Sequence, residues 1–168
     1  MNFIFRLLAA ATLTATARAA ETDSRVFLNA NAVKWEQAPA LLPQGAKVAV
    51  LFGRPDDPGP FTLRVSAPAH YKIPPHWHSK AESLTVISGT LYLGAGDTMD
   101  PAVAVALKEG GYHYLPARAH LYAMMKTPTV IQISGEGPFD VNYLDPRDDP
   151  QAAAISGAEG RSFKDSIR

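Results

Sequence analysis

The five histidines of this chain lie within one stretch, between residues 70 and 120. Two of them, His76 and His78, are separated by a single residue, and Glu82 follows four residues after His78. Residues two apart in a strand face the same side, so the two imidazoles are expected to stand next to each other. A short turn after His78 would bring the Glu82 carboxylate back toward both rings.

Two imidazoles and one carboxylate form a three-ligand set for a divalent transition metal, with positions left open for water or substrate. The donor types suit Fe, Mn, Zn, Ni or Cu, so the residues alone do not choose the metal. The sequence contains no cysteine, which excludes thiolate ligands, disulfides and a cysteine nucleophile. The alternative is that the two histidines lie by chance in a loop beside Pro74 and Pro75.

The segments around these residues have the composition of short strands. Runs rich in β-branched and aromatic residues stop at Gly and Pro turns, which indicates an antiparallel all-β sandwich or barrel. Strands are predicted at residues 47–52, 61–65, 83–88, 91–93, 112–115, 121–126, 130–133 and 141–144. One short connecting helix is predicted at 102–108, because Asp100 can cap it, Pro101 suits its first position and Gly110 can end it.

The spacing of the metal-type residues resembles the first motif of the cupin superfamily. From His76 to Gly89 the chain has the pattern H-x-H-x3-E-x6-G, with Glu82 as the acidic residue. His70 stands where the motif begins with Gly. By this resemblance His76, His78 and Glu82 are metal ligands.

The second cupin motif is matched only in part. Gly110 and Pro116 have the expected separation, but Arg118 occupies a Gly place and Leu121 occupies the place of the family's ligand histidine. His120 precedes Leu121, and a strand side chain one residue away faces the opposite side. A bulge between Pro116 and His120 would restore its direction. Either His120 is the fourth ligand, or the site has three residues and water.

The resemblance covers roughly residues 40–145 and is to small bacterial single-domain cupins. The segments 137–139 (GPF) and 145–150 (DPRDDP) correspond to the ending of those proteins. The resemblance implies an all-β double-stranded β-helix (jelly-roll) barrel with a metal near its mouth. It also implies that the protein is a homodimer.

Further titratable residues are candidates for the pocket around a metal. Tyr122 shares strand parity with His120, and His113 alternates with Tyr112 and Tyr114. We expect Tyr122, Tyr114 and His113 in the pocket, with a packed or surface position as the alternative for His113. No nucleophile with an adjacent base, phosphate loop or dinucleotide fingerprint is visible, so no catalytic residue is assigned.

The chain begins with the features of a secretory signal peptide. Arg6 precedes an uncharged run of eleven residues (7–17), and small residues flank Arg18. Eleven residues are too few to cross a bilayer as a helix, which takes about 20. The alternative is a buried N-terminal helix. The predicted organisation is a signal peptide at 1–20, an N-terminal arm at 21–39, the barrel at 40–145 and a polar tail at 146–168.

Composition limits the function further. The 168 residues suit one domain, and 46% are hydrophobic, enough for a core. Sixteen basic residues balance sixteen acidic ones without a basic block, which gives no case for nucleic acid as a partner. We expect a periplasmic or secreted protein without a stable membrane anchor, whose partner is a small molecule.

Three functions fit these observations. The first is a metal-dependent enzyme of oxygenase or isomerase type that acts on a small organic substrate. The second is a non-catalytic barrel that binds a small ligand or a metal. The third is a degenerate, metal-free cupin that serves as an interaction module. Catalysis would require a titratable group beside the metal that is not itself a ligand.

Overall fold

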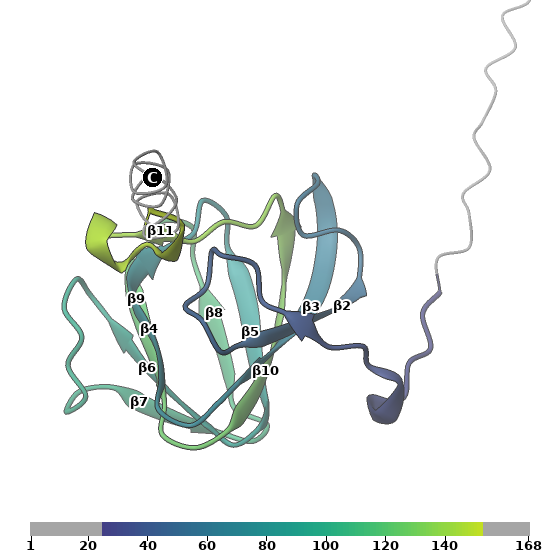
Figure 1. Cartoon of the computed structure of the whole chain (residues 1–168), viewed down its shortest axis with the longest axis horizontal. Coiled ribbons are helices and arrows are strands. Elements are labelled where there is room, and N and C mark those ends of the chain that lie inside the picture. Colours follow the sequence, from purple (N-terminus) through teal and green to yellow (C-terminus); the bar gives the residue numbers. More distant parts are fainter. Residues whose placement is uncertain (1–24, 153–168) are drawn as a thin grey trace, which may run out of the picture.

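The computed structural model describes residues 25–152, which form two antiparallel sheets that face each other (Figure 1). The strands alternate between the sheets in the jelly-roll manner, so the all-β prediction is confirmed. In spatial order, the first sheet contains β1 (Glu36–Gln37), β2 (Lys47–Phe52), β3 (Gly59–Ala67), β10 (Thr129–Gly137), β5 (Glu82–Ser88) and β8 (Tyr112–Leu115). The second contains β11 (Asn142–Tyr143), β4 (Tyr71–Trp77), β9 (Leu121–Met125), β6 (Thr90–Ala95) and β7 (Val105–Lys108).

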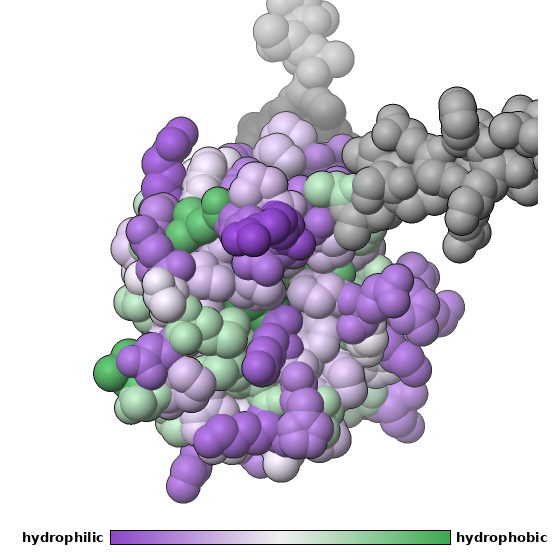
Figure 2. Space-filling view, turned by 60° about the vertical axis from the view of Figure 1, so that its left-hand side comes forward, coloured by the Kyte–Doolittle hydropathy of each residue, from purple (hydrophilic) through white to green (hydrophobic). Residues whose placement is uncertain are grey.

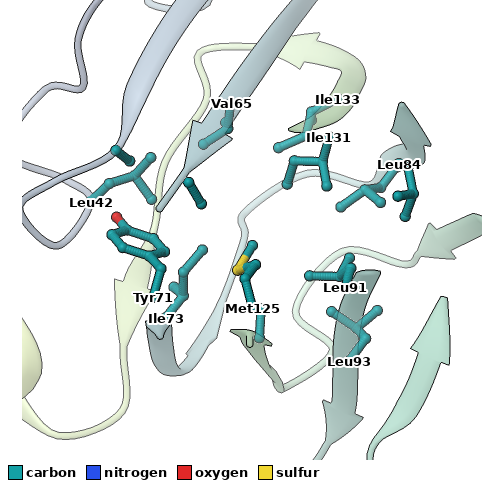
Figure 3. Packing of buried hydrophobic residues seen from close by; sticks show 14 of the residues in the cluster. Leu42, Val65, Tyr71, Ile73, Leu84, Leu91, Leu93, Met125, Ile131 and Ile133 are labelled. Carbon is teal, nitrogen blue, oxygen red and sulfur yellow. The ribbon is translucent and has the colours of Figure 1, made fainter. Parts of the chain in front are cut away.

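The core lies between the sheets and follows the alternation of the sequence. In β3 every second residue is buried, and Val65 pairs with Ile131 of β10. Figure 3 shows Val65, Ile131 and their neighbours on one side and Leu91 and Met125 of the second sheet on the other. The two sheets therefore enclose an apolar interior in which any polar side chain is exceptional.

The helix predicted at 102–108 is wrong, because Val105–Lys108 is strand β7. Asp100 does accept a hydrogen bond from the backbone N–H of Ala102 (2.8 Å), as a capping residue would. However, pairing with β6 places Leu107 opposite the fully buried Leu91, and this packing overrides the local helical preference. Short 3-10 helices occur elsewhere, at Ala30–Ala32 and Pro146–Asp148.

Both ends of the chain lie partly outside the residues that the structure describes. The predicted signal peptide at 1–20 lies outside the described residues, as does the predicted tail from residue 153 onward. Within residues 25–152, no helix is both long and apolar enough to cross a membrane.

Two turns place non-glycine residues in the left-handed region of the backbone. His70 and Arg118 both have φ of 63°, and they are the only non-glycine residues with positive φ in the described part of the chain. Both stand where the cupin motifs have Gly. Glycine adopts this conformation without the steric cost that a Cβ atom brings.

Replacing His70 by glycine is therefore expected to stabilise the fold. His70→Gly should raise the free energy of unfolding by about 0.5–1 kcal/mol, the relief of Cβ strain less the greater chain entropy of glycine. Urea denaturation would measure the change. His70→Ala is the control, because it removes the imidazole and keeps the Cβ atom. Equal stability of the two variants would show that the backbone of this turn is not strained.

Gly94 provides space for a buried aromatic ring. A Cβ atom at Gly94 would lie 2.0 Å from Cζ of Tyr122, which is fully buried. Gly94→Ala is expected to lower the free energy of unfolding by about 3 kcal/mol, because the ring cannot move without disrupting its packing. Ala95→Ser, at the exposed neighbouring residue, should change it by less than about 0.5 kcal/mol. A loss below about 1 kcal/mol for Gly94→Ala would contradict a rigid site here.

Candidate metal centre

The end of β4 and the start of β5 bring the three predicted ligands into the barrel interior. His76 lies in β4, His78 follows its last residue, and Glu82 is the first residue of β5. Their exposed fractions are 4%, 4% and 5%, respectively. Burial of polar groups is costly unless they have partners, so the contacts of these three side chains reveal what the site is built to hold.

Both imidazoles are fixed by backbone carbonyl groups. The Nδ1 of His76 lies 2.7 Å from the carbonyl oxygen of Pro74, and the Nδ1 of His78 lies 2.5 Å from that of Asp140. A carbonyl oxygen only accepts, so each Nδ1 carries the proton and donates it. In the neutral form of each ring, the Nε2 atom then has a free lone pair, and this is the form of histidine that binds metals.

The three side chains form an open group. Nε2 of His78 lies 3.8 Å from Oε1 of Glu82, and the centroids of the two imidazoles are 5.0 Å apart. Oε2 of Glu82 is buried and has no hydrogen-bond partner. Within residues 25–152, no three His, Asp or Glu side chains form a cluster that could hold a metal ion as they are placed. Completing the set therefore requires rotation of at least one side chain.

The donor types nevertheless fit a divalent transition metal. Atoms about 2.1 Å from one ion can be no more than about 4.2 Å apart, so His78 and Glu82 satisfy this limit already. The orphaned oxygen of Glu82 and the free lone pairs of the two rings are unused by the protein itself. Any rotation that completes the set would have to keep the Nδ1 hydrogen bonds that orient the imidazoles.

Burial sets the protonation of these groups. Loss of solvent, followed by the effect of neighbouring His78, lowers the pKa of His76 to about 4, although the hydrogen bond to Pro74 opposes this shift. His76 is therefore neutral at neutral pH, as a metal ligand must be. Burial raises the pKa of Glu82, and His78 partly opposes the change.

Residues that the sequence did not single out complete the surroundings of His78. The Phe139 ring stacks on the His78 ring, with centroids 5.1 Å apart and planes 20° apart. The Asp140 carboxylate accepts a hydrogen bond from the backbone N–H of Ser79 (2.8 Å) and so holds the turn after His78. Gly137-Pro138-Phe139 was recognisable from the resemblance, but nothing in its sequence indicated a stacking role.

The structure does not bring His120 to this group. Its Nδ1 lies 2.6 Å from Oδ1 of Asp97, and 39% of its side chain is exposed. Leu121 faces inward instead, in register with His76 and only 4% exposed. The bulge that would turn His120 inward is absent from this segment, so the parity of the strand leaves an apolar side chain beside the two histidines.

The other pocket candidates also lie apart from the three residues. Tyr122 is fully buried on the opposite face of β9, where its hydroxyl donates to the carbonyl oxygen of Asp100 (2.8 Å). Tyr112 and Tyr114 are 60% and 57% exposed. His113 is half-buried and pairs with Leu84, and burial lowers its pKa.

A cavity of about 510 Å³ contains the candidate metal ligands. Its volume falls within the range of small-molecule sites. In the described part of the chain, its wall includes His76, His78 and Glu82 but none of the three pocket candidates Tyr122, Tyr114 and His113. The buried part of the wall therefore offers three donors and otherwise apolar side chains from both sheets.

Comparison with known proteins identifies the fold. No protein-family model matches the sequence, and no curated protein matches it. Among solved structures, the chain is similar to an acetylacetone dioxygenase from Acinetobacter johnsonii, with 14% identity, a TM-score of 0.56 and coverage of 88% of this chain and 87% of that one.

Two further solved structures are similar to this chain. The polyketide cyclase RemF from Streptomyces resistomycificus has 17% identity and a TM-score of 0.59, over 74% of this chain and 88% of that one. An RmlC-like cupin from Shewanella frigidimarina has 14% identity and a TM-score of 0.53, over 67% of this chain and 91% of that one. This chain thus has the fold of the cupin superfamily, as the motif in its sequence indicated.

Proposed function

We propose that this protein is a single-domain cupin that binds a divalent transition metal through His76, His78 and Glu82, and that the metal engages a small organic molecule. The observation that carries the proposal is the set of unused buried donors: two Nε2 lone pairs and the orphaned Oε2 of Glu82. Structural stability alone gives no reason to bury these atoms together without partners.

The role of the chain is to hold and shield the ligand set. When bound, a metal supplies Lewis-acid chemistry, and iron would add dioxygen chemistry. Pro74 and Asp140 orient the imidazoles through their carbonyl groups, while Phe139 covers one face of His78. The name of one structural neighbour, a dioxygenase, supports an enzyme of oxygenase type, and that of another, a polyketide cyclase, supports an enzyme that acts on an organic molecule.

A non-catalytic metal- or ligand-binding barrel is the second candidate. It is favoured by a specific observation: in the described residues, the buried part of the cavity wall has no acid or base other than the three candidate ligands. General acid–base catalysis requires such a group within reach of the substrate. An enzyme at this site would have to rely on the ligand set itself or on the exposed rim of the cavity.

Elemental analysis tests the proposal. The chain would be expressed with its N-terminal segment intact and purified without a chelator or a histidine tag. We expect about one equivalent of a transition metal, and His76→Ala should lose it because a set of only three protein ligands cannot spare one. Absence of metal even after reconstitution would overturn the proposal and leave a metal-free binding module.

Two further parts of the proposal concern location and assembly. The composition of residues 1–20 supports export to the periplasm or the medium. Cleavage after export would be visible as a shortened N-terminus by mass spectrometry. The resemblance to small cupins supports a homodimer, which analytical ultracentrifugation would measure.

A further inference from the structure

The cavity wall is apolar between its few polar groups. Residues from both sheets contribute, including Leu63 of β3, Ile133 of β10, Ile73 of β4 and Leu121 of β9. Figure 3 shows how the side chains of β3, β5 and β10 face those of β4 and β6 across the interior. By contrast, the outer face seen in Figure 2 is mostly hydrophilic, with separate hydrophobic groups.

The central strands of this wall use their backbone hydrogen-bonding groups in sheet pairing. β3 is paired on both sides, with β2 and β10, and β9 is paired on both sides, with β4 and β6. In the described residues, the only buried polar side chains on the wall are His76, His78 and Glu82. A hydroxyl group of a ligand would therefore lose its water without gaining a partner, except next to these three residues.

The exposed residues of the wall do not change this conclusion. Lys34, Glu36, Asp56 and the uncharged Gln37 also line the cavity, and all four are exposed. The three charged residues carry both signs, and all four remain hydrated, so they neither select one charge nor satisfy polar groups deep in the barrel.

We infer that the ligand of this cavity is a small molecule with an apolar body and one oxygen-bearing end. This inference rests on the proposed function for that end, which would meet the metal held by His76, His78 and Glu82. The body would lie against the aliphatic wall, and polyhydroxylated molecules such as sugar acids would be rejected. The proposal thus names the substrate class of the site.

Straight-chain carboxylates test the inference directly. Butanoate, hexanoate and octanoate would be titrated into the zinc-loaded protein and followed by chemical-shift changes. Affinity should rise about fourfold for each added CH2 that is buried. Gluconate has the same number of carbon atoms as hexanoate but carries hydroxyl groups. It should bind about fivefold to a hundredfold more weakly, which is the loss expected for one unpaired hydroxyl. Equal binding of gluconate and hexanoate would overturn the inference.

A matched pair of variants shows whether the cavity itself binds these molecules. Val48 is half-buried on the wall, so Val48→Phe should narrow the cavity and weaken octanoate binding more than butanoate binding. Val105 is 62% exposed and is not part of the wall, so Val105→Phe should leave both affinities unchanged. Unaltered octanoate binding by Val48→Phe would overturn the inference.

The metal-free protein separates this inference from the proposed function. After treatment with a chelator, 1-butanol, 1-hexanol and 1-octanol would replace the acids, since an alcohol needs no metal to place its chain in the cavity. Affinity that rises with chain length supports the inference even if elemental analysis finds no metal. Affinity independent of chain length in both series overturns it, even if the metal is present.

Discussion

Replacing His76 and His78 together by alanine is expected to abolish any effect of metal on thermal stability. Metal that binds only the folded chain stabilises it, by about 2.7 kcal/mol when the free metal concentration is one hundred times Kd. For a chain of this size, that corresponds to roughly 5–10 °C in melting temperature. Differential scanning calorimetry of the metal-loaded protein, before and after excess chelator, would measure this difference.

The informative quantity is the change in melting temperature that chelator causes in each protein, not the difference in melting temperature between the proteins. The double variant removes two buried rings and will be less stable in either condition, because it leaves space in the interior. Only the chelator-dependent part of the melting temperature reports on the metal. His120→Ala is the control, since it removes a surface imidazole paired with Asp97 and should keep the full chelator effect. A chelator effect that survives in the double variant would place the metal elsewhere.

Much of the barrel could be predicted because its strands are short and end at strong turn signals. The segment 112–115 coincides with β8, and the predicted strand at 47–52 coincides with β2. Residues 102–108 were predicted incorrectly because local helix signals at Asp100 and Pro101 competed with pairing between β7 and β6. β6 and β7 are consecutive strands, but strand formation at residues 105–108 depends on this cross-strand packing rather than on local propensity.

The metal-type residues could be found from sequence because period-two spacing fixes which side chains share a face. His76 and His78 are both buried in the interior, and Glu82 comes within 3.8 Å of His78 after a short turn. The place of His120 could not be derived, because it depended on whether a bulge occurs before β9. The stacking of Phe139 on His78 could not be derived either, because it brings together residues 61 positions apart in the chain.

The position of Leu121 leads to the second large expected effect. Leu121 is in register with His76, faces the cavity and occupies the place where cupins have a fourth ligand. Leu121→His would therefore add an imidazole on the inner face, beside donors that lack partners. Removing a hydrogen-bond partner of a metal ligand already changes metal affinity about 10- to 100-fold. A gained ligand should therefore tighten metal binding by at least about tenfold. Competition with a chromophoric chelator would measure the change.

The same substitution should destabilise the metal-free protein more than the metal-loaded protein. Without metal, the new imidazole lies in an apolar cavity and should cost about 1–3 kcal/mol. With metal, each tenfold gain in affinity returns about 1.4 kcal/mol, so the difference in melting temperature between the two forms should widen. Leu121→Phe provides a ring without a donor atom and should not widen it. Equal metal affinity for Leu121→His and Leu121→Phe would mean that a side chain at position 121 cannot reach the ion, and that three protein ligands complete the set.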